Sequence, residues 1–167
     1  MNRIQEIIKV LDLKKHPEGG YYKETYRSNG FIESNCLDNN YDGKRNYSTC
    51  IYFLLTSDEF SAFHKINQDE IWHFHEGSSI LLHTLSENGK HEEYYIGNNI
   101  TNGEQPQLIV PGNHWFAAST IEDNSYALVS CTVSPGFDFK DFILPTRKEL
   151  VEKFPQYKSI IKNFTHQ

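Results

Sequence analysis

Short β-type segments separated by turn residues are the feature that most limits what this chain can fold into. Between residues 20 and 134 the sequence breaks into pieces rich in Tyr, Phe, Ile, Val and Thr, with Gly, Asn, Pro and Ser clustered between them. This spacing is typical of an all-β sandwich or barrel and predicts about nine strands. The predicted strands cover residues 20–28, 47–55, 60–66, 69–76, 79–85, 91–97, 107–110, 114–119 and 125–134.

Turn residues predict how some of these strands connect. Asn88-Gly89 lies between two predicted strands, and both residue types tolerate the positive φ that a tight hairpin turn requires. Gly77-Ser78 predicts a second reversal. Residues 29–46 are polar, contain two glycines and show little periodicity, so we expect a mobile surface loop there.

Helical spacing occurs only near the two ends of the chain. Isoleucine and leucine recur at three- and four-residue intervals over residues 2–12, which predicts a helix that ends before Pro17. Thr146 and Glu149 have the spacing of a capping box, which predicts a second helix over residues 146–163. We expect both helices to pack on the β structure.

Composition limits the class of protein. The chain has 167 residues, 38% of them hydrophobic, which predicts one domain over residues 1–167, with its β part over about 20–143. It has no run of 18 apolar residues, and its first residues lack the pattern of a signal peptide, so we expect a cytoplasmic protein without membrane contact. The net charge of -6, without a basic run, disfavours nucleic acid as a partner.

The cysteines do not predict a disulfide framework. Cys36, Cys50 and Cys131 are odd in number and far apart in the sequence. Two of them lie inside apolar runs, where a free thiol packs like a small hydrophobic side chain.

Residues 61–77, SAFHKINQDEIWHFHEG, concentrate three of the eight histidines beside acidic and aromatic residues. Here the sequence resembles the cupin superfamily, whose first motif is Gly, five residues, His-x-His, three or four residues, Glu, six residues, Gly. Glu70 and Gly77 have the matching separation, which puts His64 at the second histidine position and Ala62 at the first. The second cupin motif, Pro-x-Gly-x-x-His, resembles residues 111–116, where Asn113 replaces the glycine and Phe116 the histidine.

Four blocks together resemble one group of small single-domain cupins of unknown function. The blocks are HPEGGYYKETYRS (16–28), SAFHKINQDEIWHFHEG (61–77), QLIVPGNHWF (107–116) and CTVSPGFDF (131–139). The resemblance implies a double-stranded β-helix, the cupin jelly roll, with a central pocket and a homodimeric assembly. It implies no particular activity, because one fold supports many functions.

His73-Phe74-His75 has the appearance of a metal-binding pair, because alternate residues of a strand point to the same side. The register of the motif favours a different interpretation. If Glu70 faces the pocket, Trp72 and Phe74 share its side and both histidines face away. We therefore expect these rings to be hydrogen-bonded at a sheet or subunit interface.

A functional metal in the pocket is not expected. Catalytic transition-metal sites normally use three protein ligands, and the matched register offers only His64 and Glu70, since Ala62 and Phe116 cannot bind an ion. His114 stands two residues from the expected position and is the alternative that would complete a divalent metal site. Without a metal, His64 beside Glu70 or Asp69 forms an acid–base pair, or a hydrogen bond that merely satisfies two buried groups.

Other residues are candidates for ligand contact. In the first strand Tyr22 and Glu24 alternate with Arg27, so only one of the two faces should line the pocket. A buried arginine there would offer a planar fork to an anionic group, whereas an arginine on an edge strand is more often solvated. The candidates for ligand contact are Tyr22, Glu24, Arg27, Tyr52, Trp72, Trp115 and Phe116.

Two loops are expected to have structural roles. Residues 17–20, Pro-Glu-Gly-Gly, are typical of a turn into the first strand, with Glu18 in solvent. Residues 135–139 should close one end of the barrel. Asp138 and Asp141 in and after that segment are interpreted as loop caps.

These observations lead to one main functional hypothesis and two alternatives. We expect a cupin that binds a small organic ligand. If the protein is an enzyme, His64 and Glu70 are the catalytic residues of a metal-independent isomerase or epimerase, in which His64 is the base that abstracts a proton next to a carbonyl. The general acid that returns the proton would be a tyrosine, and the candidates are Tyr22, Tyr26 and Tyr52. The alternatives are a non-catalytic binding or sensor module and a metal-dependent cupin enzyme.

Overall fold

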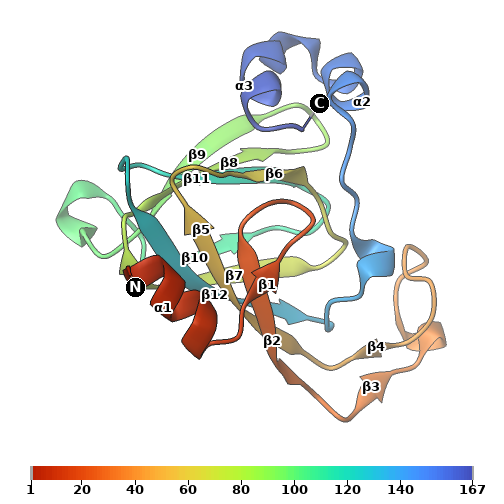
Figure 1. The fold of residues 1–167 in the computed structure, drawn as a ribbon. Coiled ribbons are helices and arrows are strands. Elements are labelled where there is room, and N and C mark those ends of the chain that lie inside the picture. Colours follow the sequence, from red (N-terminus) through yellow and green to blue (C-terminus); the bar gives the residue numbers. More distant parts are fainter. Residues whose placement is uncertain (1, 167) are drawn as a thin grey trace.

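The computed structural model describes residues 2–166, in which two large antiparallel sheets pack face to face with helices outside them (Figure 1). The six-stranded sheet has the order β1 (Lys14–Lys15), β2 (Tyr21–Arg27), β5 (Thr49–Thr56), β12 (Tyr126–Ser134), β7 (Asp69–Gly77), β10 (Gln107–Val110). The four-stranded sheet has the order β6 (Ser61–His64), β11 (Trp115–Thr120), β8 (Ile80–Leu85), β9 (His91–Ile96). The nine predicted strands correspond to β2 and β5 to β12, so the predicted all-β fold with terminal helices is confirmed.

The hydrophobic core lies between the two sheets. Phe53, Trp72 and Val129 of the six-stranded sheet pack against residues of the four-stranded sheet that include Leu82 and Phe116. All five side chains are at most 2% exposed. Alternation along each strand places these apolar residues on the inner face, which is why the hydrophobic effect closes the two sheets on each other.

The turns differ in detail from those predicted. β8 and β9 form the expected hairpin, but only Gly89 in its turn has positive φ, and the Gly89 amide donates to the Ser86 carbonyl at 2.9 Å. The loop therefore spans residues 86–90 rather than two residues. Gly77, at φ +100°, carries the chain from β7 in one sheet to β8 in the other instead of joining neighbouring strands.

The N-terminal helix α1 (Arg3–Val10) begins at Asn2, whose side chain and Gln5 form a capping box. Ile7 of this helix is buried with Leu54 and Leu128 on the outer face of the six-stranded sheet. The apolar stripe predicted from the spacing of isoleucines is thus the surface that docks α1.

The predicted C-terminal helix over residues 146–163 is wrong in its continuity. The structure contains α2 (Arg147–Lys153), the 3-10 turn η4 (Pro155–Tyr157) and α3 (Lys158–Asn163). Pro155 has no amide hydrogen and disfavours helical backbone at the residue before it, so α2 ends at Lys153 with Phe154 as its C-cap. Figure 1 shows this segment beyond the four-stranded sheet, where Leu150, Phe154 and Ile161 pack on that sheet's outer face.

Residues 29–46 are more ordered than the predicted loop. They contain a two-stranded sheet of β3 (Phe31–Ile32) and β4 (Arg45–Asn46) and the short 3-10 turn η1 (Ser34–Cys36). The sequence did not indicate this order because two-residue strands leave no periodic pattern. The other 3-10 turns are η2 (Ile100–Asn102) and η3 (Phe139–Asp141).

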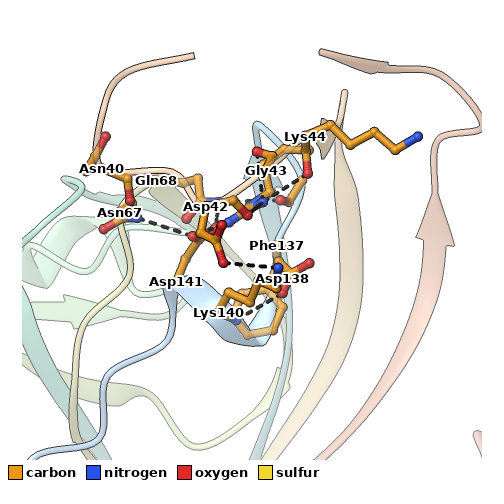
Figure 2. Close-up of polar contacts among 12 residues, drawn as sticks. Asn40, Asp42, Gly43, Lys44, Asn67, Gln68, Phe137, Asp138, Lys140 and Asp141 are labelled. Atoms are coloured by element: carbon orange, nitrogen blue, oxygen red, sulfur yellow. Dashed lines mark hydrogen bonds and ion pairs between the residues drawn. The ribbon is translucent and has the colours of Figure 1, made fainter. Parts of the chain in front are cut away.

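A buried ion pair ties this segment to the loop that follows β12. Arg45 donates from Nε and Nη2 to both carboxylate oxygens of Asp141, at 2.7 and 2.6 Å, and both side chains are 2% exposed. Gln68 and Asn67 donate to the same carboxylate at 2.7 and 3.2 Å (Figure 2). Asp141 therefore does more than the predicted loop cap, since it holds three separate segments together.

The turn before β2 is shaped by glycine. The Glu18 carbonyl accepts from the Ala62 amide at 2.8 Å, which fixes the turn against β6. Gly19 has φ +115°, and a Cβ at this position would overlap the carbonyl oxygen of Phe60. Only glycine fits this backbone, and the turn places the Glu18 side chain inside the protein.

We expect Asp141→Asn to lower the free energy of unfolding by about 3–5 kcal/mol, because it leaves the Arg45 charge buried without its partner. Urea denaturation followed by circular dichroism measures the change. Lys140→Met is the matched control, since it removes an exposed ion pair with Asp42 from the same 3-10 turn and should cost less than about 1 kcal/mol. If both substitutions lowered the free energy of unfolding equally, the buried ion pair between Arg45 and Asp141 would not be what holds these segments together.

We expect Gly19→Ala to destabilise the protein by at least about 2 kcal/mol more than Gly103→Ala, because of strain and overlap with the Phe60 carbonyl. Both glycines have positive φ, but a Cβ at Gly103 meets nothing within 4 Å. The comparison of their midpoints in urea therefore isolates the close approach at Gly19. Similar midpoints for the two variants would show that the turn relaxes.

Candidate functional site

A cavity of about 430 Å³ opens at one end of the space between the sheets. Its volume lies within the range of about 300–1,000 Å³ typical of small-molecule sites. Its aromatic walls are Tyr22, Phe53, Trp72, Phe137, Phe139 and Phe142. Its polar and charged residues are Lys14, His16, Glu18, Glu24, Arg27, Thr49, His64, Glu70, Cys131 and Asp138.

A buried pair, Glu18 and His64, forms the centre of the polar wall. The His64 Nε2 atom lies 3.1 Å from Glu18 Oε2, and the side chains are 3% and 7% exposed. The other carboxyl oxygen, Oε1, accepts from the Ser61 hydroxyl at 2.8 Å. Glu18 comes from the turn before β2, and the other two residues come from β6, so the pair depends on the contact between that turn and this strand.

The contacts of His64 fix where its proton lies. Nδ1 is 2.7 Å from the Ala62 carbonyl oxygen, which can only accept, so Nδ1 carries the hydrogen. In the neutral ring Nε2 is then a bare acceptor, and its contact with Glu18 Oε2 requires a shared proton. The two side chains therefore act as one unit that holds a proton between them.

Burial determines the charge of this unit. It raises the pKa of Glu18 well above its ordinary value, and the nearby Glu70 carboxylate raises it further. Burial also lowers the pKa of His64 to about 3. Both changes favour a neutral carboxyl that donates to a neutral imidazole.

Glu70 is the second buried carboxyl group of the cavity. It lies on β7, in register with Val133 of β12, and burial raises its pKa to about 7. A carboxyl group with this pKa is partly ionised near neutral pH. It is therefore suited to exchange protons with a bound molecule under those conditions.

A second imidazole flanks the same carboxyl group. His16 Nδ1 lies 3.3 Å from Glu18 Oε2 and accepts from the Glu18 amide at 3.4 Å. Burial lowers the pKa of His16 to about 4, so this ring is also neutral at pH 7. Its ring packs on Tyr22 and Phe142, which holds it at the edge of the cavity.

A β-bulge explains how Tyr22, Glu24 and Arg27 come to face the cavity together. Strict alternation predicts that Arg27 points away from the other two. In the structure the register of β2 against β5 shifts between Glu24 and Tyr26, which reverses the alternation after the bulge. Arg27 then donates from Nε and Nη2 to both oxygens of Glu24, at 2.9 and 2.7 Å, at the rim of the cavity.

The structure does not bring all candidate ligand contacts together. Trp72 lines the cavity, and Phe116 lies behind it in the core with its ring centroid 4.0 Å from that of His64. Tyr52 packs with α1 and near His75 on the outer face of the six-stranded sheet. Trp115 lies under the C-terminal helices, next to Lys65 and Lys153. The cavity is therefore not lined by Phe116, Tyr52 or Trp115.

His73 and His75 also lie outside the cavity, on the outer face of the six-stranded sheet. His73 contacts Thr132 Oγ1 at 3.3 Å, and His75 contacts Ser130 Oγ at 3.0 Å. Their hydrogen bonds agree with the interpretation drawn from the register of the motif. His114 precedes β11, contacts the Gly112 carbonyl at 3.2 Å and does not line the cavity.

The cavity residues do not fit a metal ion in this arrangement. His16, Glu18, His64 and Glu70 have suitable donor types, but among the described residues they do not bring three donor atoms within 4.8 Å of one another. The nitrogens of His16 and His64 contact the same carboxyl oxygen from either side instead.

Sequence reasoning missed His16 and Glu18. The prediction that Glu18 lies in solvent is wrong, because the side chain is 7% exposed. Both residues belong to the HPEGG block that carried part of the cupin resemblance, and this block was the available signal. A turn motif alone does not show that its charged residue points inward.

Comparisons with known proteins agree with the fold. A family model described as Cupin superfamily (DUF985) matches residues 5–145. The uncharacterized protein YML079W of Saccharomyces cerevisiae is 37% identical over 151 residues, which are 83% of this chain and 73% of the yeast protein.

Solved structures extend the comparison. Protein SO0799 from Shewanella oneidensis is 34% identical, with a TM-score of 0.89 over 99% of both chains. A hypothetical protein from Leishmania major is 33% identical, with a TM-score of 0.89 over 99% of this chain and 100% of that one. Oxalate decarboxylase from Bacillus subtilis is 14% identical, with a TM-score of 0.55 over 92% of this chain and 37% of that one. At this identity the likeness shows the fold alone.

Among the described residues, no helix is long and apolar enough to cross a membrane. The resemblance inferred from four sequence blocks is confirmed by the family match over most of the chain and by the yeast relative. The chain belongs to the Cupin superfamily (DUF985) family.

Proposed function

We propose that this cupin is an enzyme that moves a proton next to a carbonyl group of a small, hydroxyl-rich compound, as a sugar isomerase or epimerase does. The observation that carries the proposal is the buried Glu18–His64 pair beside Glu70 in one cavity. Two carboxyl groups with different proton affinities are the elements of general acid–base catalysis. No step requires a metal.

Glu70 is the proposed base. Its pKa of about 7 leaves part of the population ionised at neutral pH, so the carboxylate accepts the proton from the carbon next to the carbonyl. His64, the base expected from the sequence, is less suitable. Burial lowers its pKa to about 3, and its Nε2 atom already faces Glu18.

Glu18 is the proposed acid. As Glu70 removes the proton from carbon, the electron pair forms a carbon–carbon double bond and the carbonyl oxygen gains negative charge. Glu18 gives its proton to that oxygen, which produces a neutral enediol. The Ser61 hydroxyl still donates to the ionised Glu18. Glu70 then gives its proton to the neighbouring carbon while Glu18 takes the proton of the neighbouring hydroxyl, which completes the isomerisation.

The charges around the cavity favour an uncharged substrate. Arg27 is paired with Glu24. Among the described residues that line the cavity, Lys14 is the other cation, and it is opposed by Asp138 and the partly ionised Glu70. The cavity therefore has no surplus of positive charge for an anionic substrate. Carboxyl oxygens accept hydrogen bonds from hydroxyl groups, while aromatic walls pack on the C–H faces of a sugar ring. Tyr22 is the one candidate tyrosine that lines the cavity and is the proposed contact for a substrate hydroxyl.

We expect Glu70→Gln to slow exchange of substrate hydrogen with solvent deuterium by about 10²–10⁴-fold, because the base is lost while its shape is kept. Proton NMR of a panel of uncharged keto and aldo sugars in deuterium oxide measures the exchange. Glu76→Gln is the matched control, since Glu76 lies on the same strand but pairs with Arg3 outside the cavity. Absence of exchange with every compound, or equal rates for Glu70→Gln and wild type, would contradict the proposal.

The same reaction should depend on pH in a defined way. The base must be ionised, so kcat/KM should rise as pH increases through about 7, the pKa of Glu70. It should fall again at the higher pH at which Glu18 loses its proton. A rate that is flat between pH 5 and 8 would exclude Glu70 as the base.

The proton arrangement of His64 is testable without a substrate. We expect nitrogen-15 NMR to show a neutral His64 ring with its hydrogen on Nδ1 from pH 8 down to about 5, because the pKa is lowered to about 3. His64→Gln identifies the resonance by its disappearance. A ring that is protonated at pH 6, or that carries its hydrogen on Nε2 alone, would contradict the assignment of the shared proton to Glu18.

A further inference from the structure

We propose that His83, His91 and Glu93 form a binding site for a divalent transition-metal ion of the zinc class. The site lies outside the cavity, on the outer face of the four-stranded sheet and next to the C-terminal helical segment. It is independent of the proposed reaction. Its ligands come from the hairpin that β8 and β9 form.

Strand pairing brings the three side chains together. His83 of β8 is directly opposite Glu93 of β9, and His91 lies two residues before Glu93 and so on the same face. The donor atoms, His83 Nδ1, His91 Nε2 and one carboxylate oxygen of Glu93, all lie within 4.8 Å of one another. The group converges because of sheet register rather than through flexible loops.

The distances match the edges of a zinc coordination tetrahedron. Zinc–ligand bonds of about 2.0–2.1 Å place neighbouring ligands about 3.3–3.4 Å apart. His83 Nδ1 lies 3.2 Å from His91 Nε2 and 3.4 Å from Glu93 Oε1. His91 Nε2 lies 4.0 Å from the same oxygen, and the 49% exposed Glu93 side chain is free to close this gap by rotation.

The donor chemistry selects the class of ion. Two imidazoles and one carboxylate are the ligand types that zinc and its neighbours in the first transition row prefer, whereas magnesium and calcium prefer oxygen alone. The hydrogen bond between His83 Nδ1 and His91 Nε2 contains one hydrogen, and a bound ion would take its place. Each ring then carries its hydrogen on its other nitrogen, so neither imidazole has to lose a net proton.

The surroundings of the group shield two sides and leave one open. The Phe164 ring packs on His83 with centroids 5.0 Å apart, and the Tyr157 ring packs on His91 at 5.3 Å. The Tyr157 hydroxyl donates to the Gly89 carbonyl, so it is already used. The exposed Glu93 carboxylate marks the open side, through which an ion enters and a water molecule completes the coordination.

Zinc titration of the full-length protein without an affinity tag tests the site. After treatment with a chelator and dialysis, competition with a chromophoric zinc indicator should show one equivalent of Zn²⁺ bound. We expect His91→Gln and Glu93→Gln each to weaken binding by at least tenfold. Circular dichroism checks that each variant is folded, and the smaller, more exposed Glu93→Gln change keeps the test decisive if His91→Gln is unstable.

His75→Gln is the matched control, because His75 lies on the outer face of the other sheet and hydrogen-bonds to Ser130. Its zinc affinity should equal that of wild type. Three results would overturn the proposal: no stoichiometric binding, wild-type affinity in both hairpin variants, or a loss of binding in Glu70→Gln that the hairpin variants do not share. Loss of binding in Glu70→Gln alone would place the ion in the cavity. Absence of stoichiometric binding would leave only a hydrogen bond between His83 and His91.

Discussion

The shared proton between Glu18 and His64 is the interaction on which the proposed chemistry depends. Transfer of an ionised carboxylate out of water is so costly that a buried carboxyl group must be neutral or closely paired. Here the Ser61 hydroxyl and the imidazole each satisfy one carboxyl oxygen, so the group is buried without an uncompensated charge. This arrangement keeps a transferable proton inside an apolar cavity at neutral pH.

The same cavity shows how burial assigns different roles to similar groups. Glu18 and Glu70 are both buried, which raises the pKa of each, and the ionised Glu70 carboxylate raises the pKa of Glu18 further. The group that ionises first makes the second ionisation harder, which separates the pKa values of the two. A pair of carboxyl groups separated in this way supplies one acid and one base at a single pH, which neither residue provides alone.

The sequence predicted the strands well and the cavity only in part, for physical reasons. Alternation and turn residues are local, so the nine strands and the roles of Glu70 and Trp72 as inward-facing residues followed from them. The bulge in β2 and the inward turn of Glu18 depend on contacts with β5 and β6, which are distant in sequence. Tyr52 was misplaced for a related reason, because an aromatic residue on a strand does not reveal which face of the sheet is inner.

Among the described residues, two pairs of histidines lie on strands, and the two pairs differ in the residues around them. His73 and His75 alternate on one strand, and each is bonded to a hydroxyl of β12. His83 and His91 lie on adjacent strands, so cross-strand pairing points their nitrogens at each other and adds a carboxylate from the next residue on that face. In the described part of this chain, the donor atoms of the cross-strand group converge and those of the His-x-His pair do not, because convergence here depends on the register between strands.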